Sequence, residues 1–266
     1  MTIKLFASDL DGTLLNSNRS VSARNKAAIK NVVDAGKIFV IATGRMYVGA
    51  CRFAEELNLD IPMATYNGAL VKTAISKKIL YEHRIKIETA QKVLDYVKKR
   101  GYHLHYYTGD DVFTQKDDKY GLTYSEIIGV PVKAIGDDLF VAKEPPYKML
   151  LAVEREELPS VFKEISEKFK DCLDVTTSSG IYIELMEPGI NKWESIKAIA
   201  KGYGIKPEEI MCFGDSGNDI TMVENAGIGV AVANAQEDVK KVARLITLSN
   251  DEDGVAVEIE KILAGM

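Results

Sequence analysis

Five consecutive apolar residues at 38–42, Ile-Phe-Val-Ile-Ala, form a run of strand length that is rich in β-branched side chains. A strand with one solvent-exposed face alternates apolar and polar residues, whereas a strand that is covered on both faces is apolar throughout. Residues 38–42 therefore predict a strand inside a parallel sheet with helices on both sides. Residues 3–7 predict a second buried strand of the same kind.

Helical and extended patterns alternate around these two strands. Helices are predicted at residues 22–34 and 47–57, and a third short strand is predicted at 62–66. This order is typical of a doubly wound α/β fold, which is Rossmann-like in its parallel sheet. The same alternation resumes after Pro188, with a helix at 193–204, a strand at 209–213, a helix at 220–225, strands at 229–232 and 245–248, and a helix at 254–264.

The middle of the chain has a different pattern, in which one helix is followed by two strands. This order occurs twice, at 88–115 and again at 155–186. We therefore predict an inserted α+β domain at residues 83–187, and a core domain made of residues 1–82 and 188–266. The inserted strands alternate apolar and polar residues, so one face of their sheet is expected to be more exposed than the core sheet.

The composition excludes several classes of protein. The chain has 266 residues, 46% of them hydrophobic and 27% charged, with a net charge of −5. No basic stripe appears, which argues against a nucleic-acid or anionic-membrane partner. Three cysteines without a CxxC pair indicate free thiols. With no signal peptide or apolar stretch of membrane-spanning length, we expect a cytoplasmic protein, either a monomer or a weak homo-oligomer.

Two aspartates, Asp9 and Asp11, follow the first predicted strand and are separated by a single residue. Two neighbouring carboxylates raise each other's pKa unless a cation removes their repulsion, and hard oxygen ligands suit Mg2+. A simple Asp-Gly turn is the alternative. A calcium-binding loop is excluded because apolar side chains occupy positions that need oxygen ligands: Leu15, Val21 and Ala23.

Thr43 and Gly44 follow the strand at 38–42. A hydroxyl and an exposed backbone N–H before a helix can hold a phosphate group, although Thr43 could instead simply cap that helix. Lys192 is predicted at the start of a helix after the inserted domain. Its ammonium group would suit a phosphate or an aspartate nucleophile, but a lysine there is more often a surface residue.

The sequence Gly-Asp-Ser-Gly-Asn-Asp at 214–219 follows another predicted strand. Asp215, Asn218 and Asp219 make it a dense set of acceptors for a hard cation, and a solvated turn is the alternative. In open α/β sheets, ligands bind beyond the carboxyl ends of the strands. That rule places Asp9, Asp11, Thr43 and Asp215 at one crevice.

Taken together, these stretches resemble the four ordered motifs of the haloacid dehalogenase (HAD) superfamily. The insertion lies between the second and third motifs, like the cap of the Cof-type subfamily. The sequence Tyr-Asn-Gly-Ala at 66–69 is also typical of that subfamily. Trp193 follows Lys192 where the family usually has glycine, so the start of that helix is expected to pack differently.

The resemblance implies a Mg2+-dependent phosphomonoesterase that works through an aspartyl-phosphate. Asp9 would be the nucleophile, and Asp11 the general acid and base. Mg2+ would be held by Asp9, the backbone carbonyl of Asp11, and Asp215, with Asp219 behind them. The groups expected to hold the phosphoryl oxygens are Thr43, Gly44, Lys192, Asn218 and the backbone N–H of Leu10.

The resemblance further implies a small phosphorylated substrate, most simply a sugar phosphate, with flavin mononucleotide and pyridoxal phosphate left open. The inserted domain would act as a lid that selects the leaving group. Side chains that share a strand face there could contact a sugar or form a solvated surface: His103, His105, Tyr107, Tyr182 and Glu184. A phosphomutase and a non-catalytic phosphometabolite-binding protein are the alternative functions.

Overall fold

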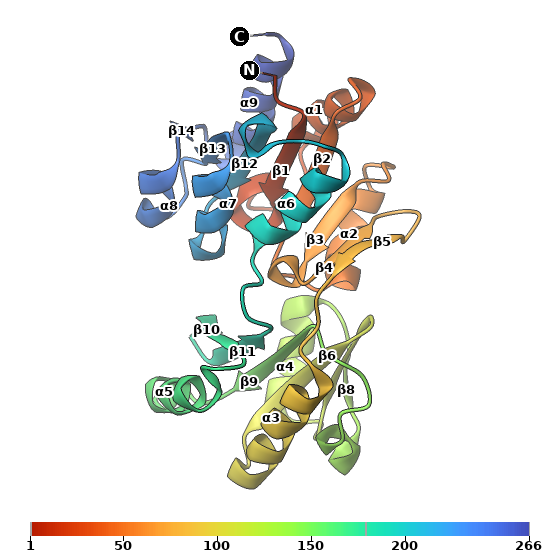
Figure 1. Cartoon of the computed structure of the whole chain (residues 1–266). Coiled ribbons are helices and arrows are strands. Elements are labelled where there is room, and N and C mark those ends of the chain that lie inside the picture. Colours follow the sequence, from red (N-terminus) through yellow and green to blue (C-terminus); the bar gives the residue numbers. More distant parts are fainter. Residues whose placement is uncertain (1, 179, 266) are drawn as a thin grey trace. The chain divides into compact units, whose positions relative to one another are not determined.

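The chain folds into two compact units, described in a computed structural model that covers residues 2–178 and 180–265. Unit 1 comprises Met1–Glu82 and Asn191–Met266, and unit 2 comprises His83–Ile190. Unit 1 is thus built from two segments that are distant in the sequence, and unit 2 lies between them in the chain (Figure 1).

Unit 1 contains an eight-stranded sheet in the order β14-β13-β12-β1-β2-β3-β4-β5. The strands from β14 to β3 are parallel, while β4 and β5 form an antiparallel edge. This mixed sheet with a parallel centre confirms the predicted α/β class. The strands are β1 (Leu5–Asp9), β2 (Ile38–Ala42), β3 (Pro62–Thr65), β4 (Leu70–Thr73), β5 (Ile79–Glu82), β12 (Ile210–Gly214), β13 (Ile228–Ala231) and β14 (Leu245–Ile246).

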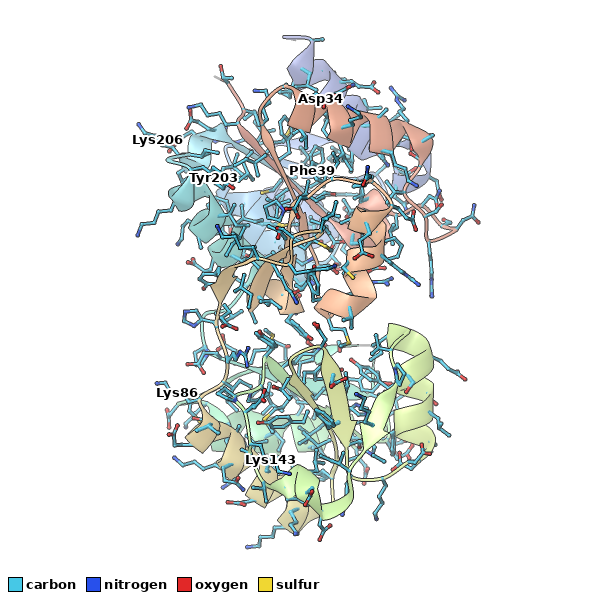
Figure 2. The ribbon with its side chains drawn as sticks, turned by 90° about the vertical axis from the view of Figure 1, so that its right-hand side faces the viewer. Asp34, Phe39, Lys86, Lys143, Tyr203 and Lys206 are labelled. Carbon is cyan, nitrogen blue, oxygen red and sulfur yellow. The ribbon has the colours of Figure 1, made fainter. Side chains whose placement is uncertain are left out.

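Helices bury both faces of the central strands. On one face, α6, α7 and α8 share a hydrophobic cluster with β1, β2 and β12. On the other, α1 packs on β2 and against α9 (Figure 1). Phe39 of β2 lies inside the unit, and Asp34 lies at the end of α1 (Figure 2). The helices are α1 (Ala23–Asp34), α2 (Tyr47–Glu55), α6 (Lys192–Gly202), α7 (Ile220–Asn225), α8 (Glu237–Val242) and α9 (Gly254–Leu263).

Unit 2 is a six-stranded sheet in the order β10-β11-β9-β6-β7-β8, with helices on both faces. α3 and α5 cover one face over a core that includes Leu104, Met149 and Ile183. The elements are α3 (Ile87–Arg100), β6 (His103–Thr108), β7 (Asp111–Thr114), α4 (Lys119–Ile128), β8 (Val132–Ala134), β9 (Lys148–Ala152), α5 (Leu158–Phe169), β10 (Asp174–Ser178) and β11 (Tyr182–Met186).

The second face of the unit 2 sheet is not the exposed surface that its alternating sequence predicts. Tyr124 of α4 stacks on His105, with ring centroids 4.6 Å apart, and packs edge-on against Tyr182. His105, Tyr107 and Tyr182 are consequently buried. The polar alternation reflects a face covered by aromatic side chains rather than by water.

Among the helices of the described residues, none combines the length and the apolar character needed to cross a membrane.

Candidate active site

The register of the parallel strands brings three predicted site segments to one edge of the unit 1 sheet. Asp9 pairs with Ala42, so Thr43 lies just beyond the same edge. Ser8 pairs with Phe213 on the other side of β1, which places the segment that begins at Gly214 next to Asp9. The carboxyl ends of β1, β2 and β12 therefore present their polar residues together.

After β1 the chain makes one wide turn, Leu10–Leu14, which folds against Asp215. Gly12 has a φ of 79°, in the region that favours glycine. A Cβ atom at Gly12 would lie 2.7 Å from Oδ2 of Asp215, so a side chain there would displace the carboxylate. Thr13 donates from Oγ1 to Oδ1 of Asp215 at 2.9 Å and fixes its orientation.

Lys192 is a fully buried cation of the site. Its side chain has no exposed surface, and its Nζ atom donates to Oδ1 of Asp9 at 2.5 Å and to Oδ1 of Asp219 at 2.6 Å. The side chain of Asn191 caps α6 by accepting from the backbone N–H of Glu194. Trp193 packs into the hydrophobic cluster of unit 1, so a large side chain after the lysine still lets Lys192 reach the carboxylates.

Asp219 orients the loop that carries Asp215. Its Oδ2 atom accepts from the backbone N–H groups of Asp215 and Ser216, each at 3.0 Å. A Cβ atom at Gly214 would lie 2.4 Å from Cβ of Asp219, so only glycine allows this approach. Because its other oxygen contacts Lys192, Asp219 holds neighbouring groups in place.

Carboxylate oxygens of Asp9, Asp215 and Asp219 lie within 4.8 Å of one another. Burial raises the pKa of Asp9 well above its usual value, Lys192 opposes this shift, and the other two carboxylates add to it. Burial, with the charge of Asp219, also raises the pKa of Asp215. One ammonium does not balance three carboxylates, and the donor set is made of hard oxygens, so the cluster fits a divalent cation such as Mg2+.

Asp11 lies outside this cluster of three carboxylates. Both of its oxygens accept from the guanidinium group of Arg45, from Nε at 2.7 Å and from Nη2 at 2.6 Å. The Asp11 side chain is half exposed, and that of Arg45 is 22% exposed. Arg45 was not among the site residues predicted from the sequence. The signal that could have identified it is its position, a cationic residue two places after Thr43, which was predicted to bind phosphate.

The groups expected to hold phosphate come from several segments: Leu10 follows β1, Thr43 and Gly44 follow β2, Lys192 begins α6, and Asn218 follows β12. Thr43 accepts from the backbone N–H of Arg45 at 3.1 Å. Because α2 begins only at Tyr47, this contact makes a local turn and not the helix cap considered as the alternative. Leu10 has a buried side chain, so only its backbone is available to a ligand.

Asn218 is held by two neighbours. Its Nδ2 atom donates to Oδ1 of Asn67 at 2.9 Å, and its Oδ1 atom accepts from Oγ of Ser216 at 2.8 Å. Asn67 also lies over Gly44, where a Cβ atom would be 3.0 Å from its Oδ1. Tyr66 and Asn67 both have positive φ values, 52° and 53°, and such strained backbone clusters at functional sites. From the sequence, residues 66–69 were predicted only as typical of a subfamily and not as part of the site.

Comparison with known proteins agrees with this geometry. Residues 6–259 match the family model of haloacid dehalogenase-like hydrolases. The chain is 30% identical to the 5-amino-6-(5-phospho-D-ribitylamino)uracil phosphatase YwtE of Bacillus subtilis, over 99% of each chain. It is 31% identical to the phosphatase YwpJ of the same organism, over 98% of this chain and all of that one.

Among solved structures, a haloacid dehalogenase-like hydrolase from Bacteroides thetaiotaomicron is similar with a TM-score of 0.89 and 31% identity. The similarity covers 98% of this chain and 100% of that one. The resemblance found in the sequence is thereby confirmed. The chain belongs to the haloacid dehalogenase-like hydrolase family, and it is a Cof-type phosphatase.

Proposed function

We propose that the protein hydrolyses small phosphomonoesters in a Mg2+-dependent reaction, with an aspartyl-phosphate formed on Asp9. The observation that carries the proposal is the buried contact between Asp9 and Lys192 at the carboxyl end of β1. Lys192 leaves the second oxygen of Asp9 outside this contact, since the ammonium bonds Oδ1. A carboxylate held in this way is a suitable nucleophile toward phosphorus.

In the first step, an oxygen of Asp9 attacks the phosphorus atom. A bond forms between them while the bond from phosphorus to the ester oxygen breaks. Protonated Asp11 gives its proton to that oxygen, so the leaving group departs as a neutral alcohol. Asp11 is left as a carboxylate.

In the second step, a water molecule attacks the phosphorus atom of the aspartyl-phosphate. A proton of the water passes to Asp11, and the bond between phosphorus and Asp9 breaks. The products are inorganic phosphate, a free Asp9 carboxylate and a protonated Asp11 that is ready for the next substrate.

The residues proposed to hold Mg2+ are Asp9, Asp215 and the backbone carbonyl of Asp11. When bound, the ion would offset the repulsion between the anionic nucleophile and the anionic phosphoryl group. Asp219 would support this site indirectly, because its oxygens already accept from Lys192 and from two backbone N–H groups. Thr13 would keep Asp215 oriented in the same way.

The phosphoryl oxygens are proposed to bind Thr43, the backbone N–H groups of Leu10 and Gly44, Lys192 and Asn218. Fixed donors that surround the transferred group supply most of the catalysis in reactions of this type. The orientation of Asn218 by Asn67 and Ser216 supports its part in this set, because its amide group cannot rotate freely.

We infer that the substrate is a small ester with a polyhydroxyl leaving group. A sugar phosphate was expected from the sequence, and the relative YwtE is named for a substrate with a phosphorylated ribityl chain. Both are phosphate esters of polyols. We assign selection of the leaving group to unit 2, the predicted cap.

The test is phosphate release from a panel of sugar phosphates, polyol phosphates and cofactor phosphates, with Mg2+ and with a chelator. We expect release from a few members, and loss of activity with the chelator. Asp9→Asn should abolish turnover. Asp11→Asn should give a burst of nitrophenol from 4-nitrophenyl phosphate, because this leaving group needs little protonation while the second step lacks its base. Wild-type turnover by Asp9→Asn would refute the mechanism.

A further inference from the structure

The guanidinium group of Arg45 and the carboxylate of Asp11 meet in a two-pronged contact. Nε and Nη2 each donate to a different oxygen, at 2.7 and 2.6 Å. This paired geometry fixes the direction of a carboxylate as well as its distance, which a lysine cannot do. The position of the Asp11 carboxylate is therefore set by a residue outside the four sequence motifs.

Arg45 is itself held in place from several sides. Its backbone N–H donates to Oγ1 of Thr43 at 3.1 Å, and its carbonyl accepts from the backbone N–H of Tyr66 at 2.9 Å. Its guanidinium group lies 5.2 Å from the ring centroid of Phe53, which is buried. A side chain supported by an aromatic ring loses little freedom when it binds its partner.

We propose that Arg45 is the positioning residue of Asp11, and that its two-pronged contact sets where the Asp11 carboxyl group lies for proton transfer to the leaving group. This inference rests on the proposed function, in which Asp11 loses its proton during the first step. A general acid must lie within hydrogen-bond reach of the oxygen that it protonates, so an Asp11 side chain without this support would transfer its proton less efficiently. Arg45 acts through Asp11 and is assigned no contact with the substrate.

The benefit of Arg45 should grow with the amount of proton transfer that the leaving group requires. 4-Nitrophenyl phosphate releases an acidic phenol and needs little protonation, whereas phenyl phosphate releases a weaker acid of similar shape. The ratio kcat/KM reports the steps up to departure of the leaving group, so it isolates the step in which Arg45 is proposed to act.

The experiment measures kcat/KM with both esters for Arg45→Met, Arg45→Lys and Asp11→Asn. Loss of a hydrogen bond to a charged group corresponds to about a 10- to 100-fold change in rate. We expect Arg45→Met to lose about this much with phenyl phosphate and less than about 3-fold with 4-nitrophenyl phosphate. Arg45→Lys should recover part of the loss, because lysine keeps the positive charge but cannot bind both carboxylate oxygens in the paired geometry.

The matched control is Arg52→Met. The Arg52 guanidinium lies 4.7 Å from the centroid of the same Phe53 ring, and Arg52 is exposed. Asp11 is paired with Arg45 and not with Arg52. This variant should leave both kcat/KM values unchanged. Thermal unfolding of each variant checks that the fold is kept.

Two results would overturn the inference. Equal losses with both esters would indicate that Arg45 binds the phosphoryl group or supports the fold. A further loss when Arg45→Met is added to Asp11→Asn would show that Arg45 does not act through Asp11. If the proposed role of Asp11 is itself wrong, a different result is expected: Asp11→Asn would keep the wild-type kcat/KM with phenyl phosphate.

Discussion

Replacing Lys192 by methionine would remove the ammonium group that contacts two buried carboxylates, those of Asp9 and Asp219. Methionine is similar in length to lysine and can fill the same space. Lys192 and Asp219 have no exposed side-chain surface, and the side chain of Asp9 is 6% exposed, so water cannot replace the lost ammonium. Burial lowers the pKa of Lys192, but the two carboxylates outweigh it and raise the pKa above its ordinary value.

The magnitude follows from the buried geometry. Breaking a buried ion pair by removing one partner costs about 3–5 kcal/mol, because the remaining charge is left uncompensated. Two carboxylates depend on Lys192, so we expect the free energy of unfolding to fall by about 4–5 kcal/mol. This is a large share of a typical folding stability of about 5–15 kcal/mol. The melting temperature should fall by roughly 10 °C or more.

The assay is urea unfolding of wild-type, Lys192→Met and Lys197→Met without divalent cations. Lys197 lies on the same helix but pairs with Glu194 at the surface, where both side chains are well exposed. Its replacement should change the stability by less than about 0.5 kcal/mol. Adding Asp219→Asn to Lys192→Met should restore part of the loss. Equal stability of Lys192→Met and wild type would refute the reasoning.

Two further predictions concern acid sensitivity and the turn after β1. Burial, followed by the charge of His103, lowers the pKa of His105 to about 3. Below about pH 6.5 the unfolded chain therefore binds a proton that the folded chain does not, and stability should fall by about 2 kcal/mol from pH 7 to 5. His105→Phe should reduce this dependence of stability on pH, as measured by urea unfolding. A variant whose stability falls as steeply with pH as that of the wild type would contradict the prediction. Gly12→Ala should raise the Mg2+ concentration needed for half-maximal activity, because its Cβ would displace Asp215. The control, Gly36→Ala, should not change that concentration. Gly36 has a similar φ of 70°, and no atom lies within 4 Å of where its Cβ would be.

The order of elements around the site could be predicted because it depends on local patterns. The buried strand at residues 38–42 has the bounds that its apolar run predicts. The α/β class was also predictable, because burial on both faces leaves a continuous apolar run. The antiparallel edge formed by β4 and β5 was not predicted, since its strands follow one another closely and β5 is largely exposed.

Part of the site depends on contacts that no sequence spacing reveals. Thr13 orients Asp215 across 202 positions of the chain, and Arg45 reaches Asp11 across 34. Neither partner choice follows from residue type alone, because it is set by the register of β1, β2 and β12. Lys192 was expected to suit a phosphate or an aspartate nucleophile, but its complete burial and its second contact, with Asp219, are visible only once both segments of unit 1 are assembled.

The division of unit 1 into two segments has a consequence for the order in which the protein folds. β1 pairs with β12, which begins only at Ile210, so the centre of the sheet cannot form until most of the chain is available. Unit 2 is continuous in the sequence, so it can form its contacts before the sheet of unit 1 is complete. Its folding would shorten the flexible chain that separates Glu82 from Asn191, which lowers the entropic cost of bringing the two segments together. Early folding of unit 2 would thus speed the assembly of unit 1, compared with a chain in which residues 83–190 were still unfolded.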